Sequence, residues 1–166
     1  MANSFYFDAS SLAKGYVPEK GSAQVHAILN SAPGNPIYVL NVGAGEVVSI
    51  FVRKRNAGII SVAYFGQALV DFETEILRAG HISKVPVSNR LALSSFPLIV
   101  AHSVNSTDAL ILKSALAITR HLRSAGDDLV LVASDQRLLR AAQAEGLAIF
   151  DPETQDQAAL AALLGP

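Results

Sequence analysis

The chain of 166 residues is predicted to fold as an α/β protein, a three-layer α/β/α sandwich around a mostly parallel central sheet. Short apolar runs alternate with segments whose apolar residues recur every three or four positions, which is typical of strands alternating with helices. The run Leu129–Ala133 is apolar throughout, as in a strand buried on both faces. The composition is 51% hydrophobic, which excludes a disordered chain. At this length we expect one domain, residues 1–166.

The first half of the chain begins with a strand at residues 4–7 that ends at Asp8. Asp8 or Ser10 then caps one or two helical turns. Apolar spacing predicts a helix over 22–30, and the apolar run 36–40 predicts a second strand. Helical periodicity resumes at Glu46, after two glycines that weaken a first turn.

In the second half, helical spacing dominates until the strand at 129–133. Asn105 and Ser106 are available as caps for the helix that contains Asp108, and Pro97 is expected to interrupt the helix before it. Asp135 follows the strand, and Gly146 closes the next helix. The remaining expected elements are helices over 59–79, within 88–103, over 136–145 and over 155–164, and a last strand over 147–150.

The composition also limits the function classes. The chain has no cysteine, which excludes disulfides, thiolate zinc sites and a cysteine nucleophile. Its formal net charge is −1, so binding of a nucleic acid would rest on a local basic patch. The N-terminal sequence lacks the pattern of a signal peptide, and no apolar stretch approaches the ~20 residues of a membrane span. We expect a cytoplasmic protein with no membrane partner, and the high apolar content indicates a self-association surface.

Four acidic residues share a position relative to strands and helices. Asp8 and Asp135 each end a strand and precede a helix, while Glu46 and Asp108 are expected in the first turn of a helix. Each one alone is also explained as a helix cap or as a complement to the helix dipole. In a parallel sheet, however, all four positions lie along one edge, and like charges crowded there favour a bound cation. An oxygen-only ligand set fits Mg²⁺ or Mn²⁺ better than zinc.

The segments around these acids resemble the four acidic motifs of PIN-domain proteins. The spacings of 38, 62 and 27 residues between successive acids resemble the bacterial VapC-like toxin branch. The resemblance spans nearly the whole chain. The matching segments are FDASSLAK at 7–14, the segment that starts at Glu46, STDALIL at 106–112 and VASDQRLL at 132–139.

This resemblance implies a PIN-like fold and a metal-dependent endoribonuclease that cleaves single-stranded or structured RNA. Such proteins are commonly the toxin of a type II toxin–antitoxin pair, neutralised by a VapB-like antitoxin, and homodimeric. The implied catalytic and metal-binding residues are Asp8, Asp108 and Asp135, with Glu46 as a ligand, directly or through water, or as the residue that orients the attacking water.

Basic residues near these motifs are candidates for phosphate contacts, which give affinity without sequence preference. A solvated helix face is the alternative explanation for each of them. The candidates are Lys14, Arg53, Lys54, Arg55 and Arg137.

Two other functions compete with the nuclease. A non-catalytic PIN-like module that binds RNA or a protein would carry the same acids as a vestigial site. A phosphoryl-transfer domain, either a response-regulator receiver or a haloacid-dehalogenase-like phosphatase, would need further acidic residues beside the first strand, where this chain has Asp8-Ala9-Ser10. The sequence therefore disfavours the phosphoryl-transfer domain.

Overall fold

A computed structural model describes residues 3–32 and 34–165, so the domain expected over 1–166 includes four residues outside this description. Its centre is one sheet of five strands in the order β3-β2-β1-β4-β5, and every neighbouring pair is parallel. The fold class predicted from the sequence is confirmed. The strands are β1 (Asn3–Phe7), β2 (Ile37–Leu40), β3 (Ile82–Val85), β4 (Asp128–Val132) and β5 (Ala148–Phe150).

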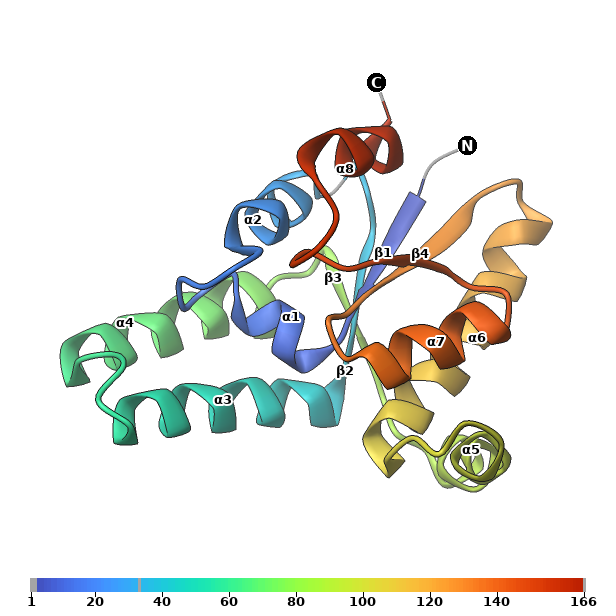
Figure 1. The fold of residues 1–166 in the computed structure, drawn as a ribbon, viewed down its shortest axis with the longest axis horizontal. Coiled ribbons are helices and arrows are strands. Elements are labelled where there is room, and N and C mark those ends of the chain that lie inside the picture. The colour runs from blue at the N-terminus through green and yellow to red at the C-terminus, as the bar shows by residue number, and fades with distance from the viewer. Residues whose placement is uncertain (1–2, 33, 166) are drawn as a thin grey trace.

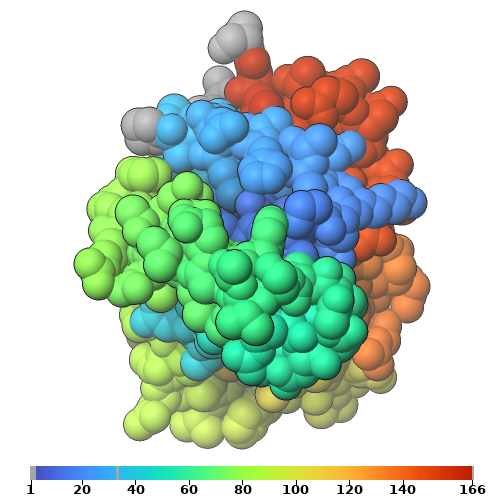
Figure 2. All heavy atoms as spheres, turned by 90° about the vertical axis from the view of Figure 1, so that its left-hand side faces the viewer, coloured from blue at the N-terminus to red at the C-terminus, as the bar shows by residue number. Residues whose placement is uncertain are grey.

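Helices cover both faces of the sheet (Figure 1). One side carries α1 (Ala9–Ala13), α2 (Ser22–Asn30), α3 (Asn41–Asn56), α4 (Val62–Phe72) with the π-helical turn η1 (Glu73–Leu77), and α8 (Gln157–Leu164). The other side carries α5 (Asn89–His102), α6 (Ser106–Ser124) and α7 (Gln136–Ala144). Seen from the first side, α4 and α3 form the front of the molecule, with α2 above them (Figure 2).

The strands divide their side chains between two hydrophobic cores. On β1, Phe5 and Phe7 face the core beneath α1–α4, whereas Tyr6 faces the core beneath α5–α7. This alternation follows from the two-residue period of a strand and explains why the buried stretches Phe5–Phe7 and Leu129–Val132 are apolar at every position. The hydroxyls of Tyr6 and Ser114 are 2.8 Å apart, so this buried polar group is hydrogen-bonded across the second core.

The topology places a crevice at the carboxyl end of β1. From β1 the chain first adds β2 and β3 on one side, and it later returns to add β4 and β5 on the other. The connections after β1 and after β4 therefore diverge at this edge, and ligands of open parallel sheets bind at such a switch point. Asp8 follows β1 here, and its backbone N–H donates to the Val132 carbonyl at the end of β4 (3.0 Å).

The segment between residues 59 and 88 differs from the prediction. One helix was expected over 59–79, but α4 ends at Phe72 and continues as the π-helical turn, in which the Arg78 N–H donates to the Glu73 carbonyl. The edge strand β3 was not predicted. It has only four residues, and Ser83 and Lys84 occupy its middle, so it lacks the apolar signal of a buried strand.

Three helix boundaries also differ. The helix carrying Glu46 begins at Asn41, directly after β2, so Glu46 lies in its second turn and both glycines lie inside the helix. Pro97 lies inside α5 without ending it, because packing of Leu98 and Ser95 against the α6 side outweighs one missing hydrogen bond. The last helix begins at Gln157, where Asp156 caps it, instead of at residue 155.

None of the helices in the described ranges has the length and apolarity needed to cross a membrane.

Candidate metal and nucleic-acid site

Asp8 and Asp135 are helix caps as well as strand-end acids. Asp8 caps α1, and its Oδ2 accepts hydrogen bonds from the backbone N–H of Ser10 (3.2 Å) and from the Ser10 hydroxyl. Asp135 caps α7, and its Oδ1 accepts from the N–H groups of Arg137 (2.7 Å) and Leu138 (3.2 Å). The capping explanation is therefore correct for both residues, and it fixes each carboxylate at the carboxyl edge of the sheet.

Asp108 and Glu46 reach the same edge from two helices. Asp108 lies in the first turn of α6, where Asn105 Oδ1 accepts from its N–H (2.8 Å). Glu46 lies on α3 and is exposed, whereas Asp108 and Asp8 are each only 7% exposed.

All four acids line one pocket of about 380 Å³, as the shared sheet edge predicts. Three polar residues that the sequence interpretation did not name as site residues, Ser10, Ser49 and Asn105, line it too. Ser49 and Arg53 follow Glu46 by three and seven residues on one helix face, a spacing that identifies them once Glu46 is placed.

The four charges act on one another. Burial, and after it the negative charges of Asp8, Asp135 and Glu46, raise the pKa of Asp108 to about 6, against the opposing charge of Arg137. Burial is also the main reason why the pKa of Asp8 is raised, with a smaller contribution from Asp135, although the hydrogen bonds from Ser10 oppose the shift. Such mutual destabilisation is what a bound cation relieves.

The donor set fits a hard divalent cation, because it offers carboxylate oxygens without sulfur or imidazole. Within residues 3–32 and 34–165, no three acidic or histidine side chains are already gathered closely enough to hold one ion. Asp8 and Asp135 are instead oriented by their capping hydrogen bonds. An ion would therefore have to draw these side chains together.

Of the five basic candidates, two lie at the carboxylates. Arg53 is exposed and lines the pocket. Arg137 is exposed and close enough to Asp108 to lower its pKa. Lys54 pairs with Glu19 (3.1 Å), and the Arg55 guanidinium lies 4.5 Å from the centre of the Phe65 ring.

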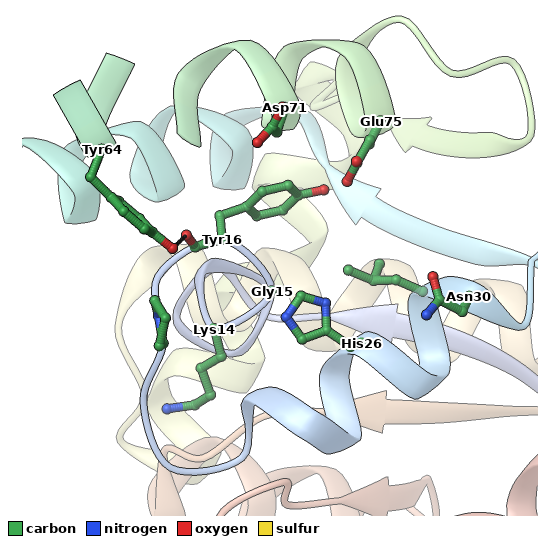
Figure 3. Close-up of a pocket in the computed structure, with 10 residues that line it drawn as sticks. Lys14, Gly15, Tyr16, His26, Asn30, Tyr64, Asp71 and Glu75 are labelled. Atoms are coloured by element: carbon green, nitrogen blue, oxygen red, sulfur yellow. Dashed lines mark hydrogen bonds between the residues drawn. The ribbon is translucent and has the colours of Figure 1, made fainter. Parts of the chain in front are cut away.

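Lys14 is buried and forms an ion pair within the fold. It is 4% exposed, and its ammonium forms an ion pair with Glu153 (2.6 Å). It lines a separate pocket beside α2 and α4, together with Tyr16, His26 and Glu75 (Figure 3). This second pocket shares no residue with the carboxylate pocket, so the structure gives Lys14 no role at the four acids.

Ser134, next to Asp135, donates its hydroxyl to Asp151 Oδ1 (3.0 Å). Asp151 is buried and also accepts from Thr154 and from the Glu153 N–H, so it organises the turn after β5. Asp128 lies at the opposite end of β4 and pairs with Arg123 (3.0 Å), far along the strand from Asp135.

The fold is similar to that of two solved structures. FitAcB from Neisseria gonorrhoeae matches with a TM-score of 0.58 at 17% identity, covering 91% of this chain and 99% of its own. PAE2754 from Pyrobaculum aerophilum matches with a TM-score of 0.56 at 17% identity, covering 90% of this chain and 92% of its own. No family model matches the sequence, and no curated protein is similar to it at the sequence level. The chain thus has the fold of these two structures, in agreement with the PIN-like fold that the acidic motifs imply.

Proposed function

We propose that the chain is a Mg²⁺- or Mn²⁺-dependent endoribonuclease that cleaves single-stranded or structured RNA. The observation that carries this proposal is the pocket at the switch point of the sheet, which is lined by Asp8, Glu46, Asp108 and Asp135. The raised pKa values of Asp8 and Asp108 support a cation there, because two buried carboxylates are held beside further negative charge.

Each acid has a distinct role in this proposal. Asp8, Asp108 and Asp135 hold the ion, while Glu46, the exposed member, binds it directly or through water or orients the attacking water. An ion held by these carboxylates would supply an activated water molecule and stabilisation of the charge that develops on the phosphate and the leaving oxygen. Arg53 and Arg137 are the cations placed to contact the phosphates on either side of the bond that is cut.

The proposed activity is tested by incubating the purified protein with end-labelled single-stranded RNA in Mg²⁺ or Mn²⁺, with a parallel reaction in EDTA. We expect internal cleavage in the metal buffers and none in EDTA. Intact RNA in every buffer would refute the nuclease.

A non-catalytic PIN-like module is the second candidate. It is favoured by one observation, that no three acids in the described chain are gathered around one point. This alternative predicts RNA or protein binding that is unchanged by EDTA and by loss of the acids, which separates it from the nuclease.

We further propose that the protein is the cytoplasmic toxin of a type II pair, with a homodimer formed through α5 and a VapB-like antitoxin bound on α4. Both helices carry large apolar side chains in solvent. Leu93, Phe96 and Val100 (84% exposed) form a stripe on α5, and Val62 (76% exposed) and Val70 lie two turns apart on α4. Two separate apolar surfaces support two separate partners.

Phe96→Glu is expected to turn the dimer into a monomer, because it places a charge in the middle of the α5 stripe. Val62→Glu is the matched control, and we expect it to leave the dimer intact but to prevent binding of a co-expressed VapB-like antitoxin. Light scattering after size-exclusion chromatography measures both outcomes. If the Phe96→Glu variant were still a dimer, the dimer interface would not lie on α5.

A further inference from the structure

A third pocket, of about 380 Å³, lies between α5 and α6, on the side of the sheet opposite α3 and α4. Its rim carries three cations, Arg90 from α5 and Lys113 and Arg120 from α6. Leu91 lines it as well, together with the hydroxyl residues Ser88 and Ser94. None of these residues belongs to the carboxylate pocket.

The three cations are not neutralised within the described part of the chain, where Arg90, Lys113 and Arg120 form neither an ion pair nor a hydrogen bond. Some basic residues elsewhere are paired, as Lys14 is with Glu153 and Arg123 is with Asp128. In a chain of net charge −1, this local excess of positive charge stands out as an anion-binding surface.

Helix geometry explains why these charges gather. Lys113 and Arg120 are seven residues apart, so they lie two turns apart on one face of α6. Arg90 lies in the first turn of α5, where Ser88 is the cap and its hydroxyl oxygen accepts from the Leu91 N–H (3.1 Å). The positive end of the α5 dipole thus adds to the three side-chain charges.

We propose that this pocket binds backbone phosphates of the single-stranded RNA whose cleavage site lies at the carboxylates, an inference that rests on the proposed function. The α6 helix joins the two pockets: Lys113 and Arg120 follow Asp108 by about 8 and 18 Å of helix rise. At about 3.4 Å per stacked nucleotide, this rise spans roughly two to five nucleotides. The RNA passes from the carboxyl edge of the sheet around α6 into the pocket between α5 and α6.

The basic pocket between α5 and α6 stays accessible in the proposed dimer. Leu93, Phe96 and Val100 are exposed on α5, whereas Leu98 and the half-buried Leu91 pack into the core shared with α6. The dimer stripe and the basic pocket therefore occupy different sides of α5. A dimer would present two such pockets, each beside its own carboxylate pocket.

The test is equilibrium binding of a fluorescein-labelled single-stranded RNA of about 20 nucleotides, measured by anisotropy in EDTA so that no cleavage occurs. The variant Arg90→Gln/Lys113→Gln/Arg120→Gln is expected to bind at least about tenfold more weakly. Its salt dependence should fall by about 2 in log–log slope, at roughly 0.7 for each lost phosphate contact. In metal buffer, KM for this RNA should rise while kcat is retained.

Two control variants are used. The first tests whether the charge of the three side chains matters, and the second tests whether loss of positive charge elsewhere on the protein has the same effect. Arg90→Lys/Lys113→Arg/Arg120→Lys keeps the charges and is expected to keep the affinity. Lys20→Gln/Arg78→Gln removes charge from other elements, the loop before α2 and the end of η1, and is expected to change affinity less than twofold.

The outcomes distinguish this inference from the proposed function. If the protein cuts RNA and the Gln variant binds as well as the unmodified protein, the basic pocket is refuted and the nuclease stands. If the protein binds RNA without cutting and the Gln variant loses binding, the pocket stands and the nuclease falls. Absence of both binding and cleavage in the unmodified protein refutes both.

Discussion

Asp108→Asn is expected to lower the rate of RNA cleavage by at least about a thousandfold, and Asp8→Asn to do the same. Metal-assisted hydrolysis draws several kcal/mol of transition-state stabilisation from the ion, and each 1.36 kcal/mol is a factor of ten in rate. The asparagine side chain keeps the size of the carboxylate and one oxygen, but it loses the negative charge that holds the ion. Single-turnover cleavage of labelled RNA measures the effect.

Asp128→Asn is the matched control, since it changes the same residue type at the other end of the sheet. It loses the ion pair with Arg123 but is expected to keep the cleavage rate within about twofold, because that pair is partly solvent-exposed. Circular dichroism must show that all three variants are folded. Full activity of Asp108→Asn would show that RNA cleavage does not depend on the carboxylate cluster.

The second large effect is on stability. In the metal-free protein the free energy of unfolding is expected to fall as the pH rises from about 4 to about 6. The pKa of Asp108 is raised from 3.8 to about 6 by burial and by the neighbouring acids, so the folded state favours the protonated carboxyl. The associated stability is complete below 3.8 and is lost by about pH 6, a loss of up to about 3 kcal/mol at 1.36 kcal/mol per pKa unit.

Asp8 acts in the same direction because its pKa is also raised. Urea denaturation at pH 4 and pH 7.5 in EDTA measures the loss. Asp108→Asn is expected to flatten this pH dependence and to be more stable than the unmodified protein at pH 7.5, because it removes a buried charge. A metal-free protein that is equally stable at both pH values would show that burial and mutual repulsion do not destabilise the charged carboxylates.

Much of this arrangement follows from the sequence alone. The run Leu129–Ala133 predicts a central strand because a strand covered on both faces has no polar positions, and β4 is buried in this way over Leu129–Val132. Parallel pairing then places Asp8 and Asp135 at one edge. The acids at 46 and 108 reach the same pocket because their helices run back from that edge.

Other features depend on tertiary contacts that no local pattern carries. Lys14 resembles a surface lysine in the sequence, yet the turn after β5 brings Glu153 to it and buries it. The edge strand β3 exists because β2 offers it an unpaired backbone, since its own residues carry little strand signal. Pro97 breaks a helix in isolation but not one that packs along α6.

The most direct test of the account is Mn²⁺ binding measured by isothermal titration calorimetry at pH 7.5, without RNA. The four-carboxylate pocket predicts saturable binding in the unmodified protein and in Asp128→Asn, and its loss in Asp8→Asn and Asp108→Asn. No detectable heat of binding at millimolar Mn²⁺ in the unmodified protein would contradict the metal site and leave the non-catalytic module.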